Sequence, residues 1–523
     1  MKILHRTYRY IPLVLAVFCL NSCLKDLDIE PIDPLVIQTF KQNEVFAKVY
    51  ASWSLSGQQG PAGSGDLEGI DEGRFSLTRS LWNCNELPTD EAICAWGDIE
   101  VTPLNRGDFT STNPSFMALY SRLFFVVTIS NHFLEQTEGK EDEESVKQRA
   151  EVRFNRALAY SYLMDLFGNV PFITVVSDEA PQQIKRADLF VWVEKELKEI
   201  EPQLYDVKAA PYYRIDKAGA WLLLARNYLN AEVYTGTARW DEAAQYAKKV
   251  MDSNYKLAGK YRYLFMADNG GAIDQSSVND APNEIIFPIS VDGVKSKAYG
   301  HTTFLINSTR TSGMPAWGTT SGWGGNRARA TLVKKFFPHG NIPSADLLTE
   351  AANDDRALLT STDRTLNISD PTKFAEGFSV VKYNNLRADG GKTSAEDFPD
   401  TDIPFMRAAE AYLTYAEAVV RGAAPIGMTA LEAVNIVRER SNATALLDLD
   451  QKVLIDEWAR EFFFEGRRRS DLIRFKQFSG NDYLWDWKGG VPGGTAISAN
   501  ANLFPIPADD LNANGNLEQN PGY

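Results

Sequence analysis

The stretch Lys217–Asp252 reads KAGAWLLLARNYLNAEVYTGTARWDEAAQYAKKVMD. Its apolar spacing predicts one helix over Lys217–Ala231 and a second over Trp240–Met251, with a break at Gly236. Small residues that let two helices approach closely recur in the first helix, at Ala218, Ala220 and Ala225. A helix pair of about 34 residues is typical of a tetratricopeptide repeat. We therefore expect a scaffold of stacked helix pairs.

Further segments carry apolar residues at helical spacing. They are residues 36–55, Ser115–Gln136, Glu151–Phe167, Ile403–Val420, Leu431–Arg440 and Ile455–Glu465. Two of them, Ile403–Val420 and Leu431–Arg440, form another candidate pair, because Gly422 and Pro425 supply a turn between them. The predicted fold class is all-α, with tetratricopeptide-like helix pairs.

A long segment between the helix pairs has a different composition. Ala267–Thr349 is rich in Pro, Gly, Ser, Asn and Trp, with one strand-like run at Glu284–Ile289. Irregular chain of this length inside a compact protein is usually functional. We expect a loop-rich insert over about residues 267–400 that forms a ligand-binding half packed against the helices.

The N-terminal segment has the pattern of an export signal. A basic head precedes the apolar run Ile11–Leu20, which is too short to span a bilayer as a helix. Cys23 follows Leu20-Asn21-Ser22, which resembles a lipoprotein box in which the cysteine is acylated. We expect a signal peptide over 1–22, a lipidated tether over 23–35 and a single domain over 36–523. No other stretch is expected to span a membrane.

Charge and cysteine content narrow the function classes. The chain has 69 acidic and 54 basic residues, a formal net charge of −15, and loss of the signal lowers this to −18. An acidic body repels nucleic acid and anionic lipid, so we expect neither as a partner. Four histidines argue against a zinc enzyme. Cys84 and Cys94 could form a disulfide or remain two free thiols.

Several short motifs occur in order along the whole chain. Beside the lipoprotein box with Lys25–Asp28, they are Arg153–Tyr160, Leu166–Phe172, Leu224–Ala231, Tyr234–Gly236, Arg407–Glu410, Ala416–Ala418, Val437–Arg440, Glu461–Gly466, Pro505–Pro507 and Gln519–Tyr523. Together they resemble the SusD/RagB family of surface nutrient-binding lipoproteins. Four more motifs are similar to the starch-binding members of that family: Asn83–Glu91, Ala267–Asn269, Gly318–Thr320 and Tyr483–Gly490.

The resemblance implies a location, a partner and a binding site. It implies a lipid-anchored protein at the outer membrane, facing the cell exterior, over a SusC-like TonB-dependent transporter. Starch-binding members use an arc of aromatic rings, which matches Trp96, Tyr299 and Trp323 here, with polar contacts at Asp71 and Arg79. The resemblance also suggests a structural calcium ion, with the candidate ligands Asp274, Asp400 and Asp402.

A site made of aromatic rings and polar side chains suits a starch-like ligand. Aromatic rings cover the flat C–H faces of a sugar, polar side chains bind its hydroxyl edges, and a curved set of rings suits an α-1,4-glucan. The predicted function is capture of starch or malto-oligosaccharides for the transporter, without catalysis and without a catalytic cofactor. The alternatives are a receptor for another glycan or a peptide, a surface glycoside hydrolase, and a scaffold that binds a protein.

One charged cluster has the composition of a catalytic site. It contains Glu457, Arg460, Glu461, Glu465 and the arginines at 467–469. Because these residues lie on a predicted helix and just after it, at spacings that permit ion pairs, we interpret them as structural. A glycosidase would instead need two carboxyl groups facing a sugar at a defined separation.

Overall fold

The computed structural model describes residues 40–271, 278–315 and 317–523. Glu44–Tyr523 forms one unit, and the few described residues before it belong to another. The predicted signal peptide and tether, with Cys23, lie outside the described residues, as does the calcium candidate Asp274. Those expectations therefore stay predictions.

The repeat stretch folds as its spacing predicts. It forms α9 (Lys217–Leu229), the short α10 (Ala231–Thr235) and α11 (Trp240–Met251). The Asp216 carboxylate caps α9 by accepting a hydrogen bond from the backbone N–H of Ala218 at 2.8 Å. Gly236 ends α10 with a φ of 77°, a left-handed conformation that glycine adopts without strain. Helices α9 and α11 then pack against each other.

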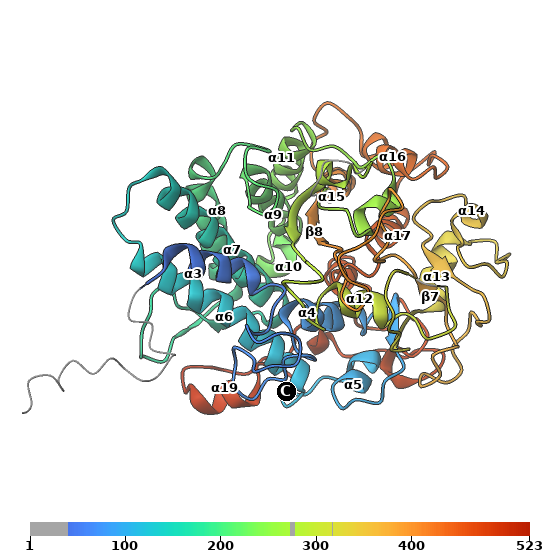
Figure 1. Ribbon diagram of the computed structural model, residues 1–523, viewed down its shortest axis with the longest axis horizontal. Helices are drawn as coiled ribbons and strands as arrows, with labels where there is room; N and C mark the ends of the chain where they lie inside the picture. The colour runs from blue at the N-terminus through green and yellow to red at the C-terminus, as the bar shows by residue number, and fades with distance from the viewer. Residues whose placement is uncertain (1–39, 272–277, 316) are drawn as a thin grey trace, which may run out of the picture. The chain divides into compact units, whose positions relative to one another are not determined.

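Neighbouring helices continue this packing in both directions (Figure 1). The contacts run through α6, α7, α8, α9, α11, α15, α16 and α17. The helices among these not yet described are α6 (Pro114–Gln136), α7 (Glu143–Phe167), α8 (Arg186–Ile200), α15 (Ala408–Arg421), α16 (Ala430–Arg440) and α17 (Gln451–Phe462). Because α11 packs on α15 although the whole insert separates them in sequence, the insert leaves the helical scaffold and returns to it.

Shorter helices complete the described chain. They are α3 (Gln42–Ala51), α4 (Leu77–Glu86), α5 (Val101–Arg106), α12 (Thr302–Asn307), α13 (Ala330–Phe336), α14 (Thr349–Ala352), α18 (Arg468–Arg474) and α19 (Ala508–Ala513). Three of these, α12, α13 and α14, lie inside the predicted insert, where composition alone gave no sign of them. They are only one or two turns long, too short to show a clear helical period.

Short strands show that the chain is helix-rich and not purely α. In the described residues they form four antiparallel pairs. These pairs are β1 (Ala92–Cys94) with β5 (Asn326–Ala328), β2 (Val170–Pro171) with β3 (Gln183–Ile184), β4 (Ile285–Ile289) with β8 (Ile403–Arg407), and β6 (Leu359–Thr360) with β7 (Ser379–Val380). The strand-like run at Glu284–Ile289 is thereby confirmed.

The helix predicted over Ile403–Val420 begins too early. Its first five residues form β8, and α15 starts only at Ala408. Strand β8 pairs with β4, which lies more than a hundred residues earlier in the chain, and most of its residues are buried. A short apolar run of this kind fits a buried strand as well as a helix, so only the distant partner settles the difference. The β4–β8 pair closes the base of the insert.

Helix α6 is long and apolar enough to cross a membrane, which the sequence interpretation overlooked. In the structure, 61% of its most apolar window is buried, and the helix packs against α4 and α7. A buried apolar helix of this kind is typical of a protein core. Among the described residues, α6 alone meets this length and composition.

Buried ion pairs join the insert to the helical scaffold. Arg407, at the end of β8, donates from Nη1 to Glu461 on α17 at 2.6 Å and to Glu284, just before β4, at 2.9 Å. Arg440 on α16 and Arg356 also pair with Glu461. Burial acts to raise the pKa of Glu461, but the charges of these three arginines lower it well below its ordinary value. The interpretation of the charged cluster around Glu461 as structural is confirmed. Its ion pairs with Arg407, Arg440 and Arg356 are buried.

Replacing Glu461 by Gln should destabilise the protein strongly. The change leaves three buried guanidinium groups short of one negative charge, which costs about 3–5 kcal/mol of unfolding free energy. Chemical denaturation measures it. The matched control is Glu199→Gln: that side chain is 48% exposed and pairs with Arg153, so the expected loss is at most about 1 kcal/mol. Equal losses in the two variants would contradict the prediction.

Candidate functional site

The β1–β5 pair brings together two of the predicted ring residues. Cys94 of β1 lies opposite Asn326 of β5, so Trp96 and Trp323 continue from the same end of the pair. The indole Nε1 of Trp96 donates a hydrogen bond to the backbone carbonyl of Trp323 at 3.1 Å. Both tryptophans are half-buried. The pairing therefore fixes one indole ring against the backbone that carries the other.

A glycine makes this close approach feasible. A Cβ atom added at Gly325 would lie 2.4 Å from Cε2 of the Trp96 ring, nearer than real Cβ atoms come to other heavy atoms. The indole of Trp96 thus occupies space that a side chain at position 325 would need. Sequence reasoning had noted that glycines flank these tryptophans, and the structure supplies the physical reason at this position.

The third ring, Tyr299, is held beside them by the start of α4. Ser76 caps α4, and its hydroxyl donates to the carbonyl of Gly300 at 2.6 Å. A Cβ at Gly300 would lie 2.0 Å from Ser76 Oγ, so only glycine fits there. The Tyr299 side chain is 38% exposed, and its ring centroid lies 6.1 Å from that of Trp323 at an interplanar angle of 66°. Edge-to-face contacts of this geometry are favourable.

The two predicted polar residues border the same rings. The Arg79 guanidinium lies 5.4 Å from the Trp96 ring centroid and donates from Nη1 to the carbonyl of Gly73 at 3.1 Å. Burial lowers the pKa of Arg79 to about 10, so it stays charged at neutral pH. A Cβ at Gly73 would touch both Tyr299 and the carboxylate of Asp71, which places exposed Asp71 at the edge of that ring. All five predicted binding residues therefore lie together.

Sequence reasoning missed two neighbours of this cluster. Arg74 follows the Gly-rich stretch Gly57–Gly73 and pairs with Asp98 at 3.1 Å and also with Glu100, so it links that stretch to the segment after Trp96. Phe398 places its ring centroid 5.5 Å from that of Tyr299. Phe398 lies in the segment Glu396-Asp-Phe-Pro-Asp400, whereas each of the other three rings is followed directly by a glycine, so no shared sequence signal marked it.

Two of the calcium candidates, Asp400 and Asp402, lie against the loop that carries Tyr299. Asp402 accepts a hydrogen bond from the N–H of Val291 at 2.6 Å, and Asp400 accepts one from Gly293 at 3.0 Å. Burial, followed by the nearby charges of Asp400 and Asp292, raises the pKa of Asp402 to about 7. A search of the described residues finds no group of three His, Cys, Asp or Glu side chains arranged to hold a metal ion.

The two cysteines for which the sequence allowed either a disulfide or free thiols are free thiols. Cys84 on α4 and Cys94 on β1 are both buried. Burial raises the pKa of Cys84 well above its ordinary value and that of Cys94 to about 12, so neither is a reactive thiolate at neutral pH.

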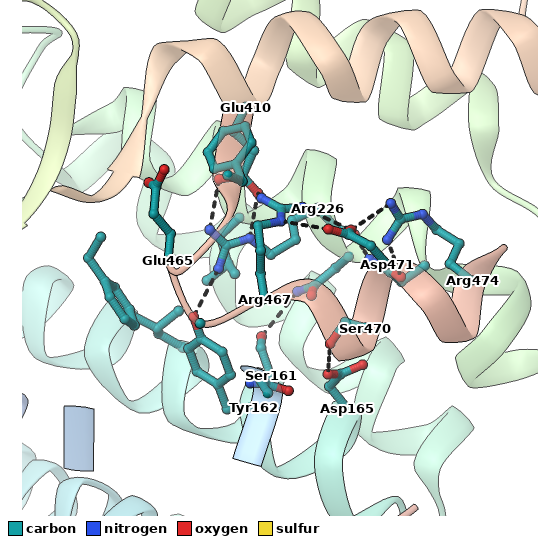
Figure 2. Close-up of a pocket in the computed structure, with 18 of the residues that line it drawn as sticks. Ser161, Tyr162, Asp165, Arg226, Glu410, Glu465, Arg467, Ser470, Asp471 and Arg474 are labelled. Carbon is teal, nitrogen blue, oxygen red and sulfur yellow. Dashed lines mark hydrogen bonds and ion pairs between the residues drawn. The ribbon is translucent and has the colours of Figure 1, made fainter. Parts of the chain in front are cut away.

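A cavity of about 60 Å³ lies among the helices, at the residues drawn in Figure 2. Its lining is strongly charged, yet the charges satisfy one another. Arg226 binds both carboxylate oxygens of Glu410, at 2.7 and 2.8 Å, and Arg467 pairs with Glu410 at 3.2 Å. Arg474 pairs with Asp471 at 2.8 Å. Burial acts to raise the pKa of Glu410, but Arg226 and Arg467 lower it.

These ion pairs bear on the hydrolase alternative. Glu410 and Asp471 are each held by at least one arginine, and Asp165 accepts hydrogen bonds from the hydroxyls of Tyr234 and Ser470. A general acid in a glycosidase needs a raised pKa, and the pKa of Glu410 is lowered. The cavity therefore has the chemistry of a packed ionic interior, and the ring cluster is the better candidate for ligand binding.

Comparisons with known proteins agree with this fold. Two family models match: one described as the SusD family over residues 283–523, and one described as "Starch-binding associating with outer membrane" over residues 83–247. Surface glycan-binding protein A from Bacteroides thetaiotaomicron, solved with laminarihexaose, is 18% identical. It covers 92% of this chain and 98% of its own, with a TM-score of 0.67. At that identity the likeness concerns the fold.

Sequence relatives give the family. The chain is 24% identical to SusD-like protein P2 of Formosa agariphila, over 81% of this chain and 83% of the relative. It is 45% identical to the starch-binding protein SusD of Bacteroides thetaiotaomicron over 538 aligned residues, which span 96% of each protein. The chain therefore belongs to the SusD family.

Proposed function

We propose that the protein binds starch or malto-oligosaccharides at the cell surface without cleaving them. The observation that carries the proposal is the contact among three half-exposed rings, Trp96, Tyr299 and Trp323, which come from distant segments. Flat, partly exposed rings cover the C–H faces of sugars, and a ring spacing of 6.1 Å supports contact of two of them with one glycan chain. The 45% identical relative is a starch-binding protein.

The polar groups at the ring edges serve the sugar hydroxyls. Asp71 accepts hydrogen bonds and Arg79 donates them, so together they match the mixed donor and acceptor character of a hydroxyl. Because the glycan is neutral, the acidic chain does not repel it. A second candidate ligand is a β-glucan, since two solved structures of the same fold are described by laminarihexaose or laminarin binding.

The helical half serves attachment and delivery in this proposal. Acylated Cys23 anchors the mature chain to the outer membrane with the ring cluster facing the exterior. The stacked pairs, such as α9 with α11, form a tetratricopeptide-like scaffold that a SusC-like TonB-dependent transporter contacts. The bound glycan passes to that transporter.

The proposal includes a structural calcium ion held by the acidic residues near the loop that carries Tyr299. Asp400 and Asp402 supply hard oxygen ligands, and each carboxylate has accepting positions left after its backbone hydrogen bonds. The ion would offset the mutual repulsion of Asp400, Asp402 and Asp292 and hold the loop from Val291 to Gly300. Asp274 is the proposed third ligand.

Titration calorimetry tests the glycan proposal. Maltoheptaose should bind the soluble chain that follows Cys23, and Trp323→Ala should weaken binding about tenfold or more, because the ring surface that covers the sugar is lost. The matched control is Trp221→Ala, which removes a half-buried tryptophan on α9, outside the cluster. Laminarihexaose is titrated in parallel. If laminarihexaose gives heat and maltoheptaose gives none, the proposed ligand is a β-glucan and not an α-glucan.

Calcium removal should lower thermal stability. Chelation by EDTA is expected to reduce the Tm of the wild-type chain, and added Ca²⁺ should restore it because bound ligand stabilises the folded state. The variant Asp402→Asn should no longer respond to either treatment. A wild-type Tm that is indifferent to both EDTA and Ca²⁺ would remove calcium from the proposal.

Acylation of Cys23 is tested by fractionation. In a host that processes such signals, the wild-type chain should sediment with outer membranes, and Cys23→Ser should leave it in the soluble fraction, because the lipid supplies the membrane affinity. Mass spectrometry of the mature N-terminus checks the modification directly. An unmodified Cys23 on a membrane-bound chain would show that another segment is the anchor.

A further inference from the structure

Phe398 continues the row of rings beyond Tyr299. Its centroid lies 5.5 Å from that of Tyr299 at an interplanar angle of 41°, and Tyr299 in turn contacts Trp323. Phe398 is half-buried, as are Trp96 and Trp323, so part of its ring is open to solvent. The four rings therefore follow one another in the order Trp96, Trp323, Tyr299, Phe398.

The backbone of Phe398 is fixed against the loop that carries Tyr299. A Cβ at Gly293 would lie 2.3 Å from the carbonyl oxygen of Phe398, so the two backbone segments are in contact there. Two residues further on, Asp400 accepts hydrogen bonds from the N–H of Gly293 at 3.0 Å and from that of Ser394 at 2.7 Å. The Phe398 ring is thus held in register with Tyr299 before any ligand arrives, which lowers the entropic cost of binding.

Two exposed polar side chains lie near this ring. Lys297 places Nζ over the ring, 5.8 Å from its centroid. Asp397 precedes Phe398 in the chain and accepts a hydrogen bond from the Thr320 hydroxyl at 2.6 Å. A flat apolar ring with a donor and an acceptor close by has the chemistry that binds a sugar ring.

We propose that Phe398, with the neighbouring exposed side chains of Lys297 and Asp397, forms an additional sugar-binding subsite at the Tyr299 end of the ring cluster. The inference rests on the proposed function and extends it to chain length. Short malto-oligosaccharides occupy Trp96, Trp323 and Tyr299, and only longer chains reach Phe398. The subsite therefore makes the protein favour long glucan chains.

Calorimetry with maltotriose and maltoheptaose tests the subsite on Phe398→Leu. Leucine keeps most of the apolar volume packed against Tyr299 but removes the flat face. The affinity for maltoheptaose should fall about tenfold, while that for maltotriose should stay within about twofold. Phe398→Trp, which retains a flat face, should preserve the preference for the longer chain.

The matched control is Tyr263→Leu. Tyr263 is also half-buried and has a lysine above its ring, with Lys260 Nζ at 5.3 Å, but among the described residues it is not part of the four-ring cluster. This variant should bind both sugars as the wild type does. Thermal melts of each variant check that the fold is retained.

The outcomes separate the two proposals. If the wild type binds neither sugar, the proposed function fails. If it binds both and Phe398→Leu leaves maltoheptaose affinity unchanged, only the subsite is overturned. An equal loss for both sugars also overturns it, because Phe398 would then support Tyr299 and not contact the glycan. A loss confined to the longer chain supports it.

Discussion

The buried charge pairs of Arg407 hold the two halves of the protein together. Its guanidinium is fully buried and contacts carboxylates on both sides of the junction: Glu284 beside β4, and Glu461 and Glu465 at the end of α17. A buried charge without a partner is very costly, so packing arrangements that separate Arg407 from these carboxylates are strongly disfavoured. It fixes where the insert leaves the helices and where it returns, and every ring of the binding cluster except Trp96 lies between those two points.

Inside that frame, the binding cluster depends on two close backbone contacts. Gly300 lies against the Ser76 hydroxyl, and Gly325 lies under the Trp96 indole. Each contact joins the insert to the N-terminal part of the chain, through α4 in one case and β1 in the other. The rings are therefore set by backbone packing, although the segments around them have little regular structure. Pre-formed rings of this kind bind a ligand without the cost of ordering loops.

The sequence predicted several helices from local signals, but it missed α8 and began α7 at Glu151 instead of Glu143. The helix α11 begins and ends where the periodicity placed it, and α7 ends at Gly168 as expected. The prediction of a helix over the residues of β8 was wrong, because this segment is a strand only through its pairing with β4, far away in the chain. The grouping of Trp96, Tyr299 and Trp323 is a tertiary property, so no spacing could supply it. The family resemblance supplied it, and where that resemblance offered no matching residue, as at Phe398, the ring was missed.

The ionic interior and the proposed binding cluster are separate parts of this molecule. The fully buried arginines pair with carboxylates or backbone carbonyls in the interior, whereas the exposed face of the cluster consists of neutral rings with Asp71 and Arg79 at its edge. A neutral polysaccharide gains nothing from a strong field, and its affinity must come from covered ring surface. Since each ring is held by its own loop, the number of rings can vary with little effect on the ionic core. Chain-length preference is then set by loops such as Glu396–Asp400, while stability is set by the helices and the Arg407 pairs.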